Sequence, residues 1–262
     1  MSLSCSDGLW SASDISLASC FVSLGDELDI DEVRSQVARH VSRGRGFVVL
    51  GSPPALPIQS ARDRLKAMAL AVGPTKPQNA HGEHVSELID TPDKADWLTP
   101  QPFHTDAGDL LFLYCIEPAQ QGGHTRLANA AAAYSQLQDQ FPDAARLLLE
   151  PWHFDRKGRP GPPTFTRRII EDPPGEPLGC FYLPGTLRMT LRNHSYPDTA
   201  LRLQALTAFD EALEHPENNI SLMLTPGDCL IVNNSRVLHA RTAYADGPKP
   251  RLLLRCWVDV VS

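Results

Sequence analysis

The hydrophobic pattern in the first third of the chain indicates helices. Val33, Val37 and Val41 recur four apart between residues 31 and 43, where acidic residues come first and an arginine comes last. This arrangement is typical of an amphipathic helix whose charges match its dipole. A second helix is predicted over residues 60–71, because a Gly-Pro pair follows it directly and would end it.

After about residue 85 the pattern changes to short apolar runs separated by turn residues. Several runs are apolar on both faces, as central strands covered by helices are. Two helical segments, 130–150 and 199–215, interrupt them, and 23 prolines and 17 glycines favour short elements. We therefore expect a sandwich or barrel of the jelly-roll kind. The predicted strands are 46–50, 85–89, 109–116, 124–130, 179–183, 187–191, 220–224, 228–234 and 251–260.

Length and composition narrow the classes of protein. A chain of 262 residues with 42% hydrophobic content can bury one large core, so a single domain is expected. The net charge of −7 lacks the basic footprint of a nucleic-acid binder, and no apolar run is long enough to span a bilayer. The N-terminus has no secretory signal, and six cysteines are scattered without a C-x-x-C pair. We expect free thiols and a cytoplasmic protein.

The segment PFHTDAGD at 102–109 holds a possible half of a metal site. In an extended segment His104 and Asp106 point to the same face and can hold one ion, with Thr105 facing away. A 2-His-1-carboxylate triad needs a distant second histidine and leaves three positions open for non-haem Fe(II) chemistry. His239, which follows a short strand and loop, is the candidate, although a lone histidine is more often a surface or core residue.

A second group of residues suits a carboxylate ligand. Arg251 and Arg255 lie four apart, hence on one face, in a strongly apolar strand. Burying such a charge is costly without a partner, and a guanidinium can bind a carboxylate with two hydrogen bonds. The simpler alternative is an edge strand with both arginines in solvent. The tight GGHT turn at 122–125 offers the hydroxyl of Thr125 as a further donor, although alone it would be a hairpin loop.

Together these motifs resemble the Fe(II)/2-oxoglutarate-dependent oxygenases of the taurine dioxygenase and clavaminate synthase-like group. They are HTD at 104–106, GGHT at 122–125, NNSRVLHARTAY at 233–244 and R-x-x-x-R at 251–255. The resemblance covers about residues 44–260 and implies one oxygenase domain over 1–262. It implies a mainly β fold with flanking helices, a double-stranded β-helix or distorted jelly roll.

The resemblance also implies roles for residues and cofactors. Fe(II), 2-oxoglutarate as co-substrate and O2 would oxidise an unactivated C–H bond, usually by hydroxylation; desaturation or oxidative ring closure is the alternative outcome. The residues that match the family's iron ligands are His104, Asp106 and His239. Thr125 matches a residue that contacts 2-oxoglutarate, Arg251 the one that binds its distal carboxylate, and Arg255 a position near the cofactor or the substrate's acid group.

The substrate implied by the resemblance is a small amino-acid-like or carboxylate-bearing molecule. Four residues are candidates for binding it: Asn79 and His81 in a loop before the metal motif, and Arg188 and Arg192 in the segment LRMTLRN at 187–193. Each is as readily explained as an ordinary solvated residue. No nucleic-acid or membrane partner is expected, and a homo-oligomer is possible.

Two other classes of function stay open from the sequence. The same three ligands could hold zinc in a hydrolase on a cupin-like barrel, with water in an open position. This reading gives no reason for a threonine and an arginine at carboxylate-binding positions. The other alternative is a non-catalytic jelly-roll binding module with a vestigial site, against which the intact set of ligands argues.

Overall fold

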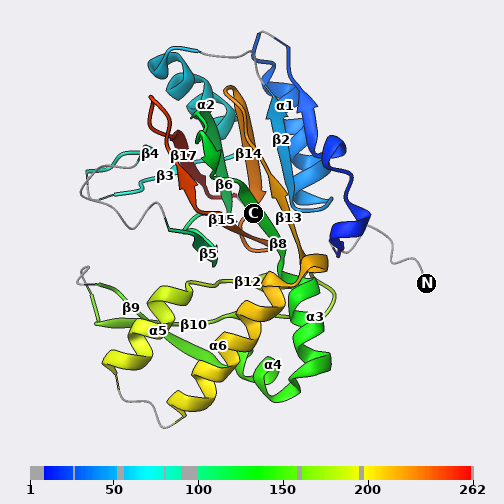
Figure 1. The fold of residues 1–262 in the computed structure, drawn as a ribbon, viewed down its shortest axis with the longest axis vertical. Helices are drawn as coiled ribbons and strands as arrows, with labels where there is room; N and C mark the ends of the chain where they lie inside the picture. Colours follow the sequence, from blue (N-terminus) through cyan, green and yellow to red (C-terminus); the bar gives the residue numbers. More distant parts are fainter. Residues whose placement is uncertain are drawn as a thin grey trace.

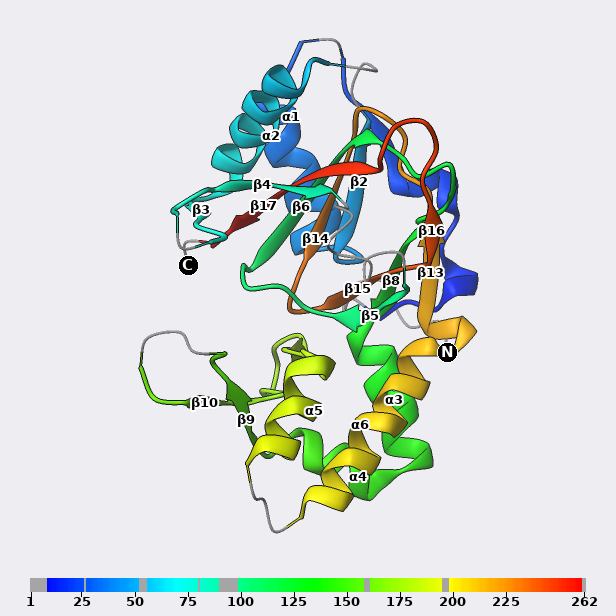
Figure 2. The same cartoon turned by 60° about the vertical axis from the view of Figure 1, so that its left-hand side comes forward.

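A computed structural model describes residues 9–25, 27–51, 56–79, 81–89, 99–157, 161–194 and 198–260. Within these ranges the chain forms two parts, shown in Figures 1 and 2. The upper part of Figure 1 contains the large sheets with α1 and α2, and the lower part contains α3 to α6. None of the helices in these ranges is long and apolar enough to cross a bilayer.

The larger sheet has seven strands in the order β1-β2-β14-β6-β17-β3, with β4 also paired to β17. All its pairs are antiparallel except β1 with β2. The strands are β1 Phe21–Ser23, β2 Phe47–Gly51, β3 Thr75–Lys76, β4 Val85–Ile89, β6 Leu110–Glu117, β14 Asp228–Asn233 and β17 Leu252–Val258.

A smaller sheet packs against the inner face of the larger one. Its order is β13-β8-β15-β5, and it comprises β5 Gln101–His104, β8 Thr125–Asn129, β13 Asn219–Leu222 and β15 Val237–Arg241. Fully buried side chains of both sheets, among them Phe47, Leu111 and Leu127, form the cluster between them. Two packed sheets with flanking helices are the arrangement expected from the sequence, so the predicted fold class is confirmed.

Two helices cover the outer face of the larger sheet. They are α1 Ile30–Gln36, which continues as a π-helix over Val37–Ser42, and α2 Ile58–Val72. The side chain of Asp29 caps α1 by accepting from the backbone N–H groups of Asp31 and Glu32. β6 and β14 are covered on both faces, which explains why nearly all their residues are apolar. This agrees with the prediction of central strands covered by helices.

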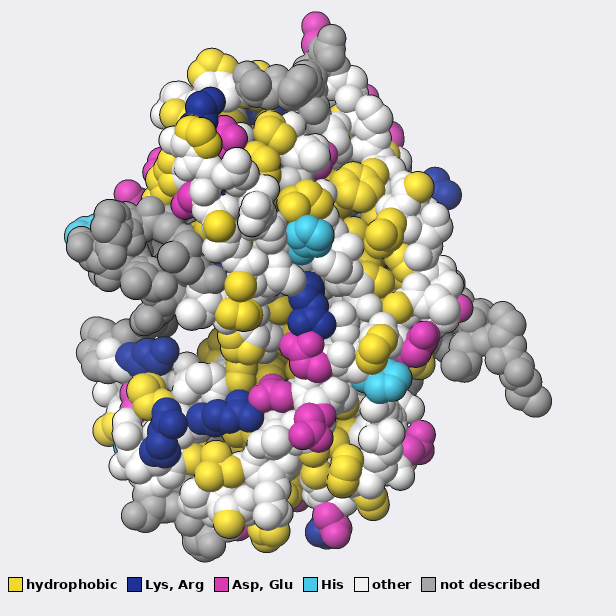
Figure 3. Space-filling model, in the orientation of Figure 1, with side chains coloured by type: hydrophobic (Ala, Val, Ile, Leu, Met, Phe, Trp, Pro, Cys, Tyr) yellow, Lys and Arg dark blue, Asp and Glu magenta, His cyan; other side chains and the backbone are white. Residues whose placement is uncertain are grey.

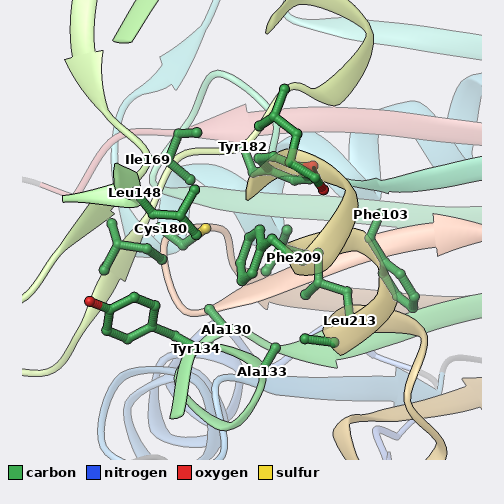
Figure 4. Close-up of a cluster of buried hydrophobic side chains, with 14 of the residues drawn as sticks. Phe103, Ala130, Ala133, Tyr134, Leu148, Ile169, Cys180, Tyr182, Phe209 and Leu213 are labelled. Carbon is green, nitrogen blue, oxygen red and sulfur yellow. Dashed lines mark hydrogen bonds between the residues drawn. The ribbon is translucent and has the colours of Figure 1, made fainter. Parts of the chain in front are cut away.

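The lower part packs four helices and short strands around its own apolar cluster. The helices are α3 Ala130–Gln140, α4 Pro142–Leu148, α5 Pro184–Asn193 and α6 Thr199–Glu214; the strands are β9 Pro151–Asp155, β10 Thr164–Arg168, β11 Ile170–Glu171 and β12 Gly179–Cys180. Figure 4 shows the cluster, which includes Tyr182, Phe209 and Phe103. Phe103 directly precedes His104, so this cluster reaches the metal motif.

Short elements complete the fold. β7 Gln121–Gly122 pairs with β16 Tyr244–Ala245, and 3-10 turns lie at Ala12–Asp14, Leu17–Cys20 and Pro216–Asn218. The φ angles of Gly122 and Gly123 are both +69°, and a side chain at Gly122 would meet the backbone of Ala243. The GGHT turn therefore requires glycine where it approaches the strand that follows His239.

The strand predicted over 187–191 is wrong, because these residues lie in helix α5. Pro184 starts the helix at a position where proline is favourable, and Leu187, Thr190 and Leu191 are buried at the i, i+3, i+4 spacing. The apolar run was too short to distinguish the 3.6-residue period of a helix from the two-residue period of a strand. The strand predicted over 179–183 is reduced to two residues.

The cysteines follow the prediction as far as the structure describes them. Cys20, Cys115, Cys180, Cys229 and Cys256 are free and buried, while Cys5 lies outside the described residues.

Candidate active site

His104, Asp106 and His239 come together at the edge of the smaller sheet, where β5 pairs with β15. His104 and His239 are cross-strand partners on β5 and β15, with ring centroids 4.2 Å apart. Asp106 follows in the turn after β5, and its Oδ2 lies 3.8 Å from His239 Nε2. Each side chain offers one ligand atom, and these atoms all lie within 4.8 Å of one another.

The hydrogen bonds of His104 determine which ring nitrogen is available. Its Nδ1 lies 2.9 Å from the carbonyl oxygen of Pro102, which can only accept, so Nδ1 carries the proton. The unprotonated Nε2 is then available to a metal. It meanwhile lies 3.3 Å from the side-chain nitrogen of Gln101.

His239 is also held as a neutral imidazole. Burial, reinforced by the neighbouring His104, lowers the pKa of His239 to about 3, and burial likewise lowers the pKa of His104. Nδ1 of His239 is buried and makes no hydrogen bond to any residue that the structure describes. Two neutral imidazoles and one carboxylate form the 2-His-1-carboxylate set that suits divalent iron.

The carboxylate of Asp106 is ionised and firmly oriented. Its Oδ2 accepts hydrogen bonds from Arg255 Nη1 at 3.1 Å and Trp257 Nε1 at 3.0 Å. Burial alone would raise the pKa of Asp106, but the interactions with His239 and Arg255 outweigh it and keep that pKa below its usual value. Trp257 therefore supports the site.

Asn234 holds the backbone of the metal turn, which is the segment from His104 to Gly108. Its side-chain Nδ2 donates to the carbonyl oxygens of Asp106 and Gly108, both at 2.7 Å, and its Oδ1 accepts from Asp106 N at 2.9 Å. Asn234 is only 3% exposed. Sequence reasoning did not single it out, although it lies in the quoted NNSR segment.

A cavity of about 110 Å³ opens beside the triad. Thr125, Arg251 and Arg255 line it, so every residue that the resemblance assigned to iron or 2-oxoglutarate lies at one place. Arg241 also lines it and was not predicted; its Nη2 donates to Thr99 O, and its Cζ lies 4.5 Å from the Tyr244 ring centroid. The lining residues are Leu88, Gln101, His104, Asp106, Leu113, Thr125, His239, Ala240, Arg241, Arg251, Leu253 and Arg255.

The two predicted arginines differ in their surroundings. Arg251 is 7% exposed, and its guanidinium carbon lies 5.4 Å from the centroid of the Tyr244 ring. Arg255 bonds to Asp106, stacks 4.4 Å from the Trp257 centroid and donates from Nε to Gln78 Oε1 at 2.7 Å. Arg255 thus contacts a candidate metal ligand directly.

The four substrate candidates are not among the residues that line this cavity. The side chain of Asn79 closes its own turn by accepting from the backbone of His81 and Glu83. His81 is exposed, and its neighbour Ala80 lies outside the described residues. Arg192 is also exposed. Arg188 donates to Asp210 Oδ2 at 2.7 Å, so its charge is paired within the lower part of the molecule.

Two curated proteins and one solved structure are among the known proteins similar to this chain. FR-33289 synthase of Streptomyces rubellomurinus is 28% identical over 86% of this chain and 72% of its own length. A uridine-5'-phosphate dioxygenase of a Streptomyces species is 33% identical over 59% of this chain and 60% of its own. PvcB from Pseudomonas aeruginosa, an Fe, alpha-ketoglutarate dependent oxygenase, has a similar fold, with a TM-score of 0.62 and 19% identity over 91% of this chain and 85% of that one.

The family match covers nearly the whole chain. The family described as "Taurine catabolism dioxygenase TauD, TfdA family" matches residues 14–257, a segment that contains the three candidate ligands, Thr125 and both predicted arginines. The match gives no support to the zinc hydrolase or to the non-catalytic binding module. The chain belongs to the TauD/TfdA family and is an Fe(II)/2-oxoglutarate-dependent dioxygenase.

Proposed function

We propose that this chain hydroxylates an unactivated C–H bond of a small molecule that carries an acidic group. The observation that carries the proposal is the convergence of His104, Asp106 and His239 with Thr125 and Arg251 on one cavity. When bound, iron and 2-oxoglutarate use O2 to supply the oxidant for such a bond.

Each side chain would then have a defined task. The triad would hold the iron, and Arg251 with Thr125 would hold the far carboxylate of 2-oxoglutarate, a charge-assisted contact in a largely buried place. Arg255 and Trp257 keep Asp106 ionised and oriented. The apolar side chains of Leu88, Leu113 and Leu253 line the same cavity and limit its water.

Basic side chains on the lower part of the molecule support the proposal of an acidic substrate. Figure 3 shows Lys and Arg side chains gathered over β10 and α5, beside the hollow between the two parts of the molecule. β10 ends in the exposed Arg167 and Arg168, and α5 carries the exposed Arg192 near its end. Among the relatives, the uridine-5'-phosphate dioxygenase is named for an anionic substrate. Opposite charge at an entrance raises the local concentration of such a ligand.

The test is an anaerobic titration of the protein with Fe(II) and 2-oxoglutarate, monitored by the visible charge-transfer band. Candidate amino acids and small phosphorylated or carboxylated molecules are then added, followed by O2. We expect a band that needs both cofactors, a spectral shift with the right substrate, and succinate formed with one hydroxylated product. A band without any succinate, or full activity with zinc and without O2, would refute the proposal. If the product is an alkene or a ring, the reaction is desaturation or oxidative ring closure and not hydroxylation.

We further propose that the enzyme works in the cytoplasm on a small molecule, without a nucleic-acid or membrane partner. The five buried free thiols and the net charge of −7 support this setting. A single oxygenase domain over 1–262 would give one cooperative unfolding transition. Light scattering on the purified protein tests whether it forms a homo-oligomer.

A further inference from the structure

The threonine between the two neighbouring metal-ligand candidates is bonded to a single distant residue. Thr105 is 1% exposed and faces the lower part of the molecule. Its backbone N–H donates to the carbonyl oxygen of Tyr182 at 2.8 Å, and its hydroxyl donates to the same oxygen at 3.3 Å. That hydroxyl also accepts from the backbone N–H of Tyr182 at 3.0 Å. Three hydrogen bonds thus connect the centre of the HTD motif to one residue.

Tyr182 is itself fixed by buried contacts. Its side chain is fully buried, and its ring packs edge-to-face on Phe209 with centroids 5.1 Å apart. Its hydroxyl donates to Asp210 Oδ1 at 2.6 Å, and Asp210 Oδ2 accepts from Arg188 Nη2 at 2.7 Å. Burial, followed by the charge of Asp210, keeps the pKa of Tyr182 well above its usual value, so the phenol stays a donor. Figure 4 shows Tyr182 and Phe209 in this cluster.

The metal turn is therefore held from two sides. The pairing of His104 with His239 and the bonds from Asn234 to Asp106 fix it from the barrel. Thr105 and Tyr182 fix it from the helical part. If the threonine only filled space, valine would serve equally well, since the two side chains have nearly the same shape. The hydroxyl is the part that holds the turn in register.

We propose that Thr105, Tyr182 and Asp210 form a positioning chain that sets the separation of His104 and Asp106 and thereby the affinity of the site for a divalent metal. The inference rests on the proposed function, because the metal concerned is the iron that the reaction needs. Arg188, a substrate candidate from the sequence, is thereby reassigned to the far end of this chain. None of the four residues lines the cavity, so each would act through the metal ligands.

The test is anaerobic titration of the metal-free full-length protein with Fe(II) alone, and with Co(II) alone, whose visible spectrum reports the geometry of its ligands. Thr105→Val should bind metal roughly tenfold or more weakly, as is usual when a group that orients a metal ligand is lost. Thr105→Ser should restore the affinity of the parent. Tyr182→Phe and Asp210→Asn should weaken binding in the same direction and alter the Co(II) spectrum.

A matched control is available in the same cluster. Tyr134 is also buried, and its hydroxyl donates to the carbonyl oxygen of Ala145 at 3.4 Å, away from the metal turn. Tyr134→Phe removes the same atom and should leave the metal affinity unchanged. If Thr105→Val and Tyr182→Phe both bind metal within about twofold of Tyr134→Phe, the chain has no positioning role and the inference is wrong.

Unfolding of each metal-free variant in urea separates positioning from stability. If Thr105→Val does not fold, Tyr182→Phe and Asp210→Asn decide the question by the same comparison. A parent protein that binds neither Fe(II) nor Co(II) would contradict the proposed function instead, so the two failures are distinguishable.

Discussion

His104 and His239 face each other across two antiparallel strands, and the ring centroids are 4.2 Å apart. Without a metal, this arrangement places the buried imidazole of His239 beside the half-buried imidazole of His104, so a proton on one ring would be unfavourable for the other. The fold thus keeps both histidines neutral, the form that can bind a cation. In acid this lowers the stability of the metal-free protein.

The stability of the metal-free protein should therefore depend on pH. The pKa of His239 is about 3 in the folded state and 6.5 ordinarily, so between these values the unfolded chain binds a proton that the folded chain excludes. Stability then rises with pH in this window and is lost as pH falls. The free energy of unfolding in urea is measured at about pH 7.5 and at about pH 5. The loss of this free energy between the two pH values should be smaller for His239→Gln than for the parent. Equal differences would contradict the assignment.

Arg251→Gln should weaken the binding of 2-oxoglutarate by roughly 10- to 100-fold, because it removes charge-assisted hydrogen bonds worth about 1.5–3 kcal/mol. Iron binding alone should change little. The measurement is the 2-oxoglutarate dependence of the charge-transfer band. Arg146→Gln, an exposed arginine that pairs with Asp143 on α4, is the control and should bind 2-oxoglutarate like the parent. Unchanged affinity in Arg251→Gln would remove Arg251 from the cofactor site.

Asn234→Ala should destabilise the fold by at least about 2 kcal/mol, because it leaves buried backbone groups of Asp106 and Gly108 without their partner. It should also weaken metal binding, since Asp106 loses its support. Chemical denaturation measures the first effect and Fe(II) titration the second. The exposed Asn193, changed to alanine, should alter stability by no more than about 0.5 kcal/mol. Similar losses in both variants would show that Asn234 has no special role.

The buried thiols should not react in the folded protein. Burial raises the pKa of Cys115 to about 12 and that of Cys256 to about 11, so neither forms thiolate near neutral pH. A Cys5→Ser variant treated with iodoacetamide should show no labelling by mass spectrometry until denaturant is added. Labelling of Cys115 or Cys256 in the native protein would show that these strands open readily.

The fold could be predicted from the sequence wherever burial is complete. β6 and β14 are mostly apolar because sheet and helices cover both faces, and runs of this length between turn residues favour buried strands. Helix α5 was misread as a strand because LRMTL is short and fits either period. The proline three residues before Leu187, a favourable helix start, was the available indication.

The site could be predicted only where chemistry restricts the residue type. The motifs indicated the three candidate metal ligands and Arg251, which lie together in the structure, because few side chains can bind iron or a carboxylate. The site contacts of Asn234, Trp257 and Arg241 were not predicted, since they are made to partners far away in the sequence, such as Trp257 Nε1 with Asp106. Tyr182 binds Thr105 through its backbone, which no side-chain pattern reveals.

The candidate ligands come from β5 and its turn and from β15, with most of the helical part between them in the sequence. A nascent chain therefore cannot bring all three candidates together until translation has passed residue 239 and β15 has docked beside β5. If these residues hold the iron, complete metal uptake would be a late step in the maturation of the protein.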